Sequence, residues 1–157
     1  MTISMACASG TESVGTGYER IKAGKCDMAL CGGSDYLSDR NMLLLKGFEF
    51  LKAATMDDDG LSRPFSEERS GFLFSEGASG IILLEELDHA MKRNAHIYAE
   101  VTGFESSSDA CSIVSMQEDG RYIENMLRRL IGDKKIDYYN AHGTGTLLND
   151  SIEAKAL

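Results

Sequence analysis

Long apolar runs are missing from this sequence. Stretches such as residues 81–84 (Ile-Ile-Leu-Leu) are far too short to span a bilayer, and no succession of basic, apolar and small residues typical of a secretory signal opens the chain. Disorder is excluded as well, because 157 residues with 43% hydrophobic content suffice for a core. We therefore expect a soluble, cytoplasmic protein.

The sequence also has few basic residues, and its cysteines lack the spacing of a disulfide or metal motif. Lys and Arg number 16 against 25 Asp and Glu, and the net charge of −9 argues against nucleic acid and anionic membranes, which both need a basic surface. The four cysteines show neither C-x-x-C spacing nor a histidine pattern for zinc. The acidic run 57–59 lacks the ligands that an EF-hand would need at Thr55 and Ser66. We expect no disulfide and no metal.

One cysteine has an unusual setting. Cys7 stands between alanines, after a short β-favouring run and before a helical stretch, which predicts a strand, a tight turn and a helix. The positive end of the helix dipole would favour the thiolate, and free backbone N–H groups could hold an oxyanion. Cys7 is therefore a candidate nucleophile. The alternative, which is the commonest fate of a lone cysteine, is a small buried hydrophobe.

Apolar periodicity predicts an α/β chain. The predicted helices cover residues 11–23, 41–53, 87–94 and 120–131, and the predicted strands cover residues 26–31, 78–85, 97–104 and 136–141. The first of these helices would cross over between two strands, and a parallel sheet is the natural outcome of such a βαβ unit.

Four stretches resemble the β-ketoacyl synthases, the condensing enzymes of fatty-acid and polyketide synthesis, and follow in that family's order. They are Met-Ala-Cys-Ala-Ser-Gly at 5–10, Ala-Leu-Cys-Gly-Gly-Ser-Asp at 29–35, Ser-Arg-Pro-Phe-Ser at 62–66 with its continuation at 71–80, and Asn-Ala-His-Gly-Thr-Gly-Thr at 140–146. The resemblance implies a thiolase-like, layered α/β/α/β/α architecture, of which this chain is an incomplete, central part. Residues 1–96 would end the N-terminal half, and residues 97–157 would begin the C-terminal half.

The resemblance implies decarboxylative Claisen condensation, in which an acyl-cysteine at Cys7 reacts with malonyl-acyl-carrier protein to give β-ketoacyl-acyl-carrier protein. It implies no cofactor, because the phosphopantetheine arm arrives on the carrier, and it implies a homodimer or a heterodimer with a similar ketosynthase chain. The alternatives are a thiolase-fold acyltransferase or hydrolase, and a non-catalytic chain-length partner subunit. Such partners usually lack the nucleophile, so Cys7 together with His142 argues against the last.

Acyl carrier protein is itself acidic, so its docking surface would have to be locally basic. The candidate sets are Lys46 with Lys52, Arg63 with Arg69, and Arg128 and Arg129 with Lys134 and Lys135. The alternative for each set is a solvated charged face.

His142 stands where a predicted strand ends in a loop with glycines at alternate positions, which lets backbone approach a ligand. By resemblance, His142 is one of two active-site histidines that hold the thioester oxygen of the extender unit and assist its decarboxylation. Thr144 and Thr146 would contact the pantetheine arm, and Phe48 would line the acyl tunnel. Residues 111–114 depart from the aromatic, histidine and threonine that many relatives carry near this channel.

Complete members of the family are well over twice this length, and their second catalytic histidine and later lysine lie beyond residue 157. A missing preorganised donor costs about two to three orders of magnitude in rate. We therefore expect residues 1–157 alone to be inactive in condensation and to be aggregated or loosely folded.

Overall fold

The computed structural model describes residues 1–55, 57–73, 75–113 and 115–157, so predictions that touch Met56, Phe74 or Val114 lie outside the described residues. The chain forms two compact units that alternate along the sequence. Unit 1 comprises residues 1–35 and 78–106, and unit 2 comprises residues 36–77 and 107–157. The predicted division into halves at residue 97 is a statement about family architecture and stays a prediction.

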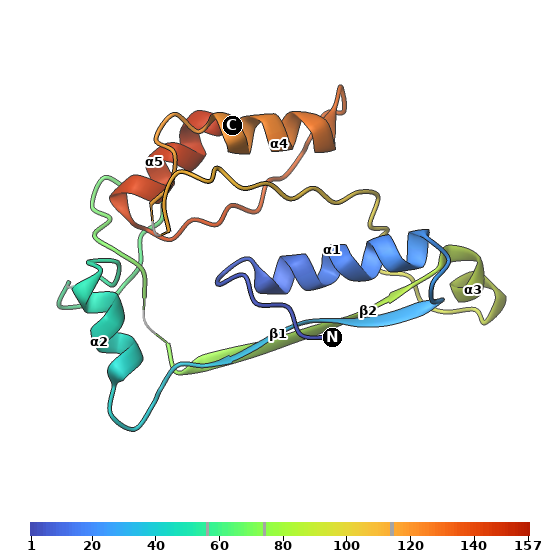
Figure 1. Ribbon diagram of the computed structural model, residues 1–157, viewed down its shortest axis with the longest axis horizontal. Helices are drawn as coiled ribbons and strands as arrows, with labels where there is room; N and C mark the ends of the chain where they lie inside the picture. The colour runs from blue at the N-terminus through green and yellow to red at the C-terminus, as the bar shows by residue number, and fades with distance from the viewer. Residues whose placement is uncertain (56, 74, 114) are drawn as a thin grey trace. The chain divides into compact units, whose positions relative to one another are not determined.

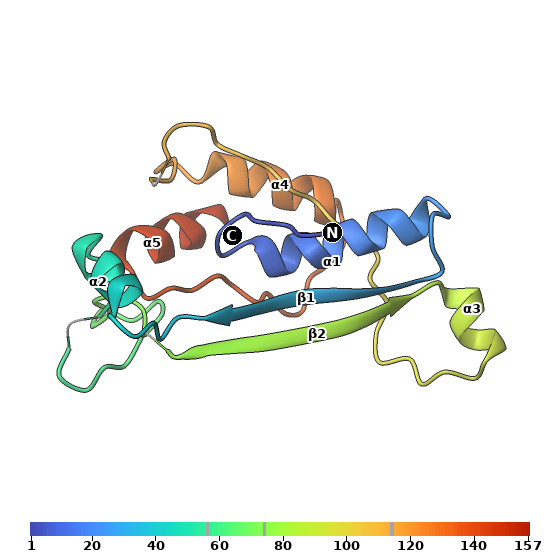
Figure 2. The ribbon, with the colours of Figure 1, turned by 60° about the horizontal axis from the view of Figure 1, so that its bottom comes forward.

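Unit 1 is a helix laid along a two-stranded ribbon. Helix α1 (Ser9–Lys22) runs beside strands β1 (Met28–Tyr36) and β2 (Gly77–Glu85), and helix α3 (Leu87–Lys92) follows β2 (Figure 1). The last residue of β1, Tyr36, and the first residue of β2, Gly77, are assigned to unit 2. The arrows of β1 and β2 point in opposite directions, so the pair is antiparallel (Figure 2). The predicted helices at 11–23 and 87–94 and the predicted strands at 26–31 and 78–85 are confirmed within a few residues.

Two glycines allow α1 to approach its neighbours closely. A Cβ atom on Gly17 would lie 2.3 Å from the Sγ of Cys31 in β1, and a Cβ atom on Gly15 would lie 2.2 Å from the ring of Phe104. Both glycines are buried. The hydroxyl of Tyr18 in the same helix donates to the carbonyl oxygen of Thr102 at 3.1 Å. The absence of side chains at Gly15 and Gly17 therefore allows α1 to pack closely on Phe104 and on β1.

The end of β2 is tied to α3 by charge. Arg93 donates from Nε and from a terminal nitrogen to the two carboxylate oxygens of Glu85, at 2.7 and 2.6 Å, and the ring of His89 meets the same carboxylate at 2.5 Å. The hydrogen bond from Arg93 makes the largest contribution, and together with that from His89 it lowers the pKa of Glu85 from 4.5 to about 2. The side chain of Glu86 caps α3 by accepting the backbone N–H of His89 at 2.7 Å.

Unit 2 contains three helices, α2 (Leu43–Phe50), α4 (Arg121–Ile131) and α5 (Leu147–Ala156). Helices α4 and α5 lie side by side in Figures 1 and 2, and Gly120 at the start of α4 approaches the carbonyl oxygen of Ile152. The buried apolar residues of the unit are Ala54, Ile152 and Ala156 among those described. The predicted helices at 41–53 and 120–131 are confirmed, whereas α5 was not predicted.

Three sequence predictions about strands are wrong for the described residues. The residues before α1 form only an isolated bridge between Met5 and Cys7, and segments 97–104 and 136–141 are not strands, although both alternate as strands do. The predicted parallel pair is therefore absent, and β1 pairs with β2 instead. The physical reason is that a strand requires a hydrogen-bonding neighbour, and segment 97–104 packs through Thr102 and Phe104 on α1 rather than on a strand.

Large apolar side chains remain exposed on the ribbon. Leu30 in β1 is 77% exposed, and β2 exposes Ile81 (59%), Ile82 (47%) and Leu83 (48%). Within the described part of the chain, no helix is long and apolar enough to cross a membrane.

Candidate functional site

Cys7 lies in a tight turn that its neighbours fix by hydrogen bonds. The backbone N–H of Ala8 donates to Met5 at 3.1 Å, and that of Ser9 donates to Ala6 at 3.1 Å. The hydroxyl of Ser9 accepts the N–H of Met5 and donates to the carbonyl oxygen of Ala6, both at 2.7 Å. Because these backbone groups are used locally, the segment forms a turn instead of the predicted strand.

The turn holds one residue in a conformation that L-amino acids rarely adopt. Ala6, directly before Cys7, has a φ of 49°, in the left-handed region, and α1 begins at Ser9, two residues after Cys7. Strained backbone of this kind is found mostly at functional sites, where contacts with the surrounding structure hold it in place. The sequence thus folds locally to present an exposed thiol beside the first turn of a helix.

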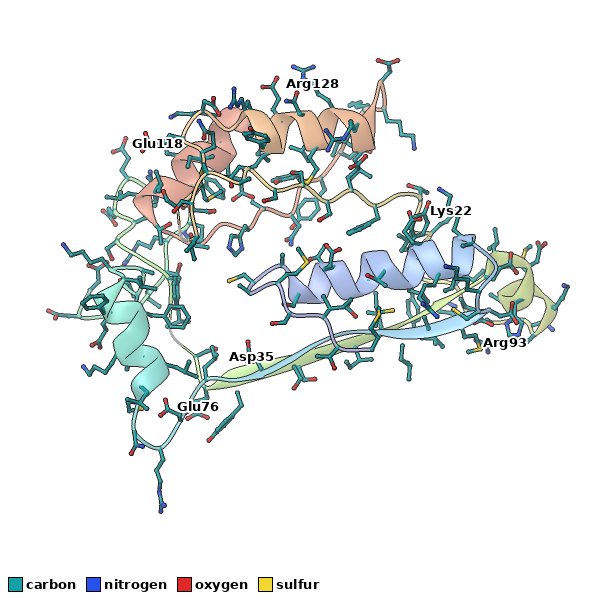
Figure 3. All side chains as sticks on the ribbon, viewed as in Figure 1. Lys22, Asp35, Glu76, Arg93, Glu118 and Arg128 are labelled. Carbon is teal, nitrogen blue, oxygen red and sulfur yellow. The ribbon has the colours of Figure 1, made fainter. Side chains whose placement is uncertain are left out.

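A pocket of about 560 Å³ opens beside the thiol within unit 1. Its walls come from the N-terminal residues, the first turns of α1 and the facing ends of β1 and β2, and most of them are small. The lining residues on the strands are Gly32, Gly33, Ser34, Asp35, Ala78, Ser79 and Gly80. Figure 3 shows Asp35 near the end of β1. Ser13 of α1 accepts the N–H of Gly32 at 3.1 Å, which joins helix and ribbon at this pocket.

The other thiols are less available for reaction. Cys31 is 5% exposed, and its burial, together with the nearby Cys26, raises its pKa. Cys111 is exposed, but desolvation of its sulfur and the neighbouring carboxylate of Asp109 raise its pKa. Cys26 is half-buried. Among the four cysteines, all of which the structure describes, Cys7 is therefore the one that is exposed, lines a pocket and lies beside the N-terminus of a helix.

The loop 142–146 is the second candidate region and lies in unit 2. Gly143 and Gly145 have φ values of 52° and 77°, and a Cβ atom on Gly145 would lie 2.7 Å from the carbonyl oxygen of Gly71 and from Ser62 Oγ. The loop therefore packs tightly on the segment 62–71, as only glycine allows. The side chain of His142 is exposed.

Glu153 of α5 holds the backbone around His142. Its carboxylate accepts the N–H of His142 at 2.7 Å and that of Gly143 at 2.9 Å, one on each oxygen. The hydroxyl of Tyr139 donates to the same group at 3.2 Å, and burial and this carboxylate raise the pKa of Tyr139. Glu153 is only 4% exposed, so this buried charge is compensated mainly by backbone donors.

Asp150, one helical turn earlier, holds the far end of the loop. It accepts the N–H of Gly145 at 3.1 Å and that of Phe65 at 2.7 Å, and Arg69 Nε lies 3.8 Å from it. Asp150 is 1% exposed. Neither Asp150 nor Glu153 was predicted as a site residue, because a carboxylate in a helix is usually exposed and no local pattern indicates that these two are buried.

The predicted substrate-contacting residues have structural partners in unit 2. The hydroxyls of Thr144 and Thr146 lie 2.9 Å apart, and Thr146 caps α5 by accepting the N–H of Asn149 at 3.4 Å. Phe48 packs edge to face on Phe72, with 5.0 Å between the ring centroids. His142, Thr144, Thr146 and Phe48 thus belong to unit 2, and Cys7 belongs to unit 1. The predicted roles of these residues stay predictions.

Several of the candidate docking cations are paired within the chain. Lys46 meets Glu49 at 2.6 Å, Arg128 meets Glu124 at 2.6 Å, and Arg63 binds the acidic run through Asp57 and Asp59. Arg128 projects from α4 in Figure 3. The pairing with Arg63 also gives the acidic run a structural role.

Within the described ranges, no three His, Cys, Asp or Glu side chains lie close enough together to form a metal site.

Unit 2 contains a smaller pocket of about 280 Å³. It is lined by residues 107–109, by Met116, Gln117 and Gly120, and by two residues of the first turn of α4. Asp109 accepts the N–H of Gln117 at 2.8 Å, and this hydrogen bond lowers the pKa of the Asp109 carboxyl.

Two family models match this chain. The model described as "Beta-ketoacyl synthase, N-terminal domain" matches residues 1–90, and that described as "Beta-ketoacyl synthase, C-terminal domain" matches residues 98–157. A 3-oxoacyl-[acyl-carrier-protein] synthase homolog from Saccharomyces cerevisiae is 41% identical over 161 residues, which cover 99% of this chain and 35% of the relative.

Solved ketosynthases share the fold of this chain. A type II polyketide ketosynthase in complex with its acyl-carrier protein matches with a TM-score of 0.86 and 33% identity, over 96% of this chain and 38% of its own. The ishigamide ketosynthase/chain length factor matches with a TM-score of 0.85 and 38% identity, over 99% of this chain and 38% of its own. The chain spans 34% to 39% of the lengths of the curated relatives.

Proposed function

This chain belongs to the β-ketoacyl synthase family and has its thiolase-like fold, and we propose that the protein that carries it catalyses decarboxylative Claisen condensation. In the first half-reaction, Cys7 Sγ attacks the acyl thioester of an acyl carrier protein, the bond from the acyl carbon to the carrier's sulfur breaks, and the carrier thiol leaves with the proton. In the second, malonyl-carrier loses CO2, and the electron pair of that bond forms a new C–C bond to the acyl carbon. Cys7 leaves as a thiolate and is reprotonated.

The observation that carries the proposal is the setting of Cys7. The thiol is exposed, lines a pocket with small walls, and lies beside the first turn of α1. A thiol attacking a thioester needs access for the carbonyl carbon, and the small side chains that line the pocket provide this access. The strained φ of Ala6 supports the same assignment, because it fixes the thiol at the tip of the turn.

His142 has the complementary role in this proposal. Its imidazole would donate to the thioester oxygen of malonyl-carrier and stabilise the enolate that forms when CO2 leaves. Support comes from the way its backbone is fixed by Glu153 while its side chain stays exposed. Thr144 and Thr146 would meet the pantetheine arm, and Phe48 would line the acyl tunnel.

The proposed partner is acyl carrier protein, which delivers phosphopantetheine thioesters, so that no resident cofactor takes part. One structural neighbour is a ketosynthase in complex with its acyl-carrier protein, and another is a ketosynthase/chain length factor pair. By extension, we propose that this protein forms a homodimer or a heterodimer with a similar chain. Its cytoplasmic location stays a prediction.

Mass spectrometry of the intact protein that carries this chain tests the proposal. After incubation with acyl-carrier protein, we expect a mass gain of one acyl group at Cys7, and after addition of malonyl-carrier we expect its loss with release of ketoacyl-carrier. Cys7→Ala should abolish both steps, whereas Cys26→Ala should leave both unchanged. No mass gain would overturn the proposal in favour of a non-catalytic subunit, and acylation without ketoacyl product would overturn it in favour of an acyltransferase.

A further inference from the structure

Asn149 lies between the two buried carboxylates that hold the His142 loop. It is 8% exposed and stands in the first turn of α5, where its own N–H is capped by Thr146. The side-chain nitrogen Nδ2 donates to Asp150 Oδ1 at 3.2 Å and to Glu153 Oε2 at 3.4 Å. These are the two oxygens that also accept the N–H groups of Gly145 and Gly143.

This arrangement makes one amide group common to both ends of the loop. Glu153 fixes the backbone at residues 142 and 143, and Asp150 fixes it at residue 145. If the spacing of the two carboxylates changed, the peptide groups on either side of Gly143 would move with them. The side-chain amide of Asn149 sets that spacing, because its two N–H bonds can serve both acceptors.

The chemistry of the position favours an amide over other side chains. Two carboxylates in a low-dielectric setting repel each other, and an uncharged donor between them relieves the repulsion without adding a charge. The other groups that face them are Tyr139, which donates to Glu153, and Arg69, whose Nε is 3.8 Å from Asp150. An apolar residue at 149 would remove the shared donor, and a carboxylate would add a third negative charge.

We propose that Asn149 is a positioning residue for the decarboxylation step, acting through Asp150 and Glu153 on the loop that carries His142. This inference rests on the proposed function of the chain. It extends that function by naming a residue that the condensation step requires and that acyl transfer to Cys7 does not require. Asn149 touches no reacting group; it determines where the His142 backbone lies.

Three variants of the intact protein separate this role from a general loss of stability. Asn149→Ala removes the donor, Asn149→Asp keeps the size but donates only when protonated, and Ser151→Ala is the matched control on the same helix, at a half-exposed position. For each, we would measure acylation of Cys7 from acyl-carrier and ketoacyl formation from the acylated protein and malonyl-carrier, at pH values from about 5.5 to about 8.5.

We expect acylation to stay within about twofold of wild type in all three variants. Ketoacyl formation should fall about tenfold to a hundredfold in Asn149→Ala at every pH, because a shift of about 1 Å in a catalytic group has this effect. In Asn149→Asp it should fall as far near pH 8.5 and recover towards pH 5.5, because burial beside the carboxylates of Asp150 and Glu153 would raise the pKa of the new carboxyl, which donates once it is protonated. Hydrogen exchange of the peptide containing residues 142–145 should speed up in Asn149→Ala and stay unchanged in Ser151→Ala.

Two results would overturn the inference while leaving the proposed function intact: ketoacyl formation by Asn149→Ala equal to that of Ser151→Ala, or an Asn149→Asp variant that matches wild type at all pH values. The first would show that the amide is dispensable, and the second that it only fills space. A wild-type protein that is never acylated at Cys7 would instead overturn the proposed function, and the positioning role with it.

Discussion

At the scale of single residues, the four cysteines show how environment separates chemically identical groups. Cys31 is enclosed by β1 and α1, where its sulfur faces Gly17, and Cys111 lies beside a carboxylate. Both settings stabilise the neutral thiol and raise its pKa. Cys7 has neither burial nor, among the described contacts, an acidic hydrogen-bond partner.

We predict that brief exposure to iodoacetamide labels Cys7 several times faster than any other cysteine of this chain, because the thiolate is the reacting species and is disfavoured at Cys31 and Cys111. Peptide mapping by mass spectrometry measures the order of labelling. Cys7→Ala should remove the fast phase, and Cys26→Ala should preserve it. Labelling of Cys111 before Cys7 would contradict the prediction.

The candidate site was predictable from sequence only where a residue's own neighbours define it. The turn around Cys7 and the glycine loop after His142 are local patterns, and both lie where they were expected. The acids that hold the loop were missed, because their partners are set by the tertiary fold: Asp150 accepts the N–H of Phe65, 85 residues away. An acidic residue in a helix is usually exposed, and nothing in its immediate sequence shows that Asp150 is buried.

At the scale of elements, helices were predicted better than strands for a physical reason. A helix satisfies its backbone within its own segment, so periodicity over 121–131 was enough to predict α4. Strand formation depends on a neighbour elsewhere in the chain, and segments 97–104 and 136–141 have no paired partner among the described residues. Helix α5 was missed because its inward face carries Asn149, Asp150 and Glu153, so that its polar residues hide the usual apolar stripe.

The packing of α1 on the ribbon depends on the absence of a side chain at residue 17. We predict that Gly17→Ala destabilises the intact protein by about 1–2 kcal/mol, because a Cβ atom there would lie 2.3 Å from Cys31 Sγ and 3.2 Å from Leu84. This cost exceeds the gain of about 0.5–1 kcal/mol that alanine brings to a helix interior. Denaturant unfolding measures the difference.

The control is Gly47→Ala in α2, where nothing lies within 4 Å of the added atom. There the helix gain is unopposed, so stability should rise by about 0.5–1 kcal/mol. Adding Cys31→Ala to Gly17→Ala should recover part of the loss, since it removes the sulfur that the new methyl group meets. Equal effects of the two glycine substitutions would contradict the packing argument.

At the scale of the whole molecule, the chain buries few of its large apolar side chains. Its buried apolar residues, among those described, are Cys31, Ala54, Ala90, Ile152 and Ala156, and four of these five are small. Strand β2 has no buried residue, although Gly77–Glu85 is rich in isoleucine and leucine. Each of β1 and β2 pairs with one described neighbour and so presents an open edge. Exposed apolar faces and open edges of this kind favour association with other protein surfaces.

We therefore predict that residues 1–157, expressed alone, associate into aggregates or remain loosely folded and release no ketoacyl product. Leu30 and Ile81, exposed by 77% and 59%, would contribute the hydrophobic driving force. The measurements are size-exclusion chromatography, denaturant unfolding, and a condensation assay with acyl- and malonyl-carrier protein. Replacing Leu30 and Ile81 by Lys should raise the monomer fraction without restoring activity, since the substitutions remove apolar surface and supply no catalytic group. A cooperative monomer of the unaltered segment that forms ketoacyl product would contradict this prediction, because 34% to 39% of a relative's length would then suffice for the reaction.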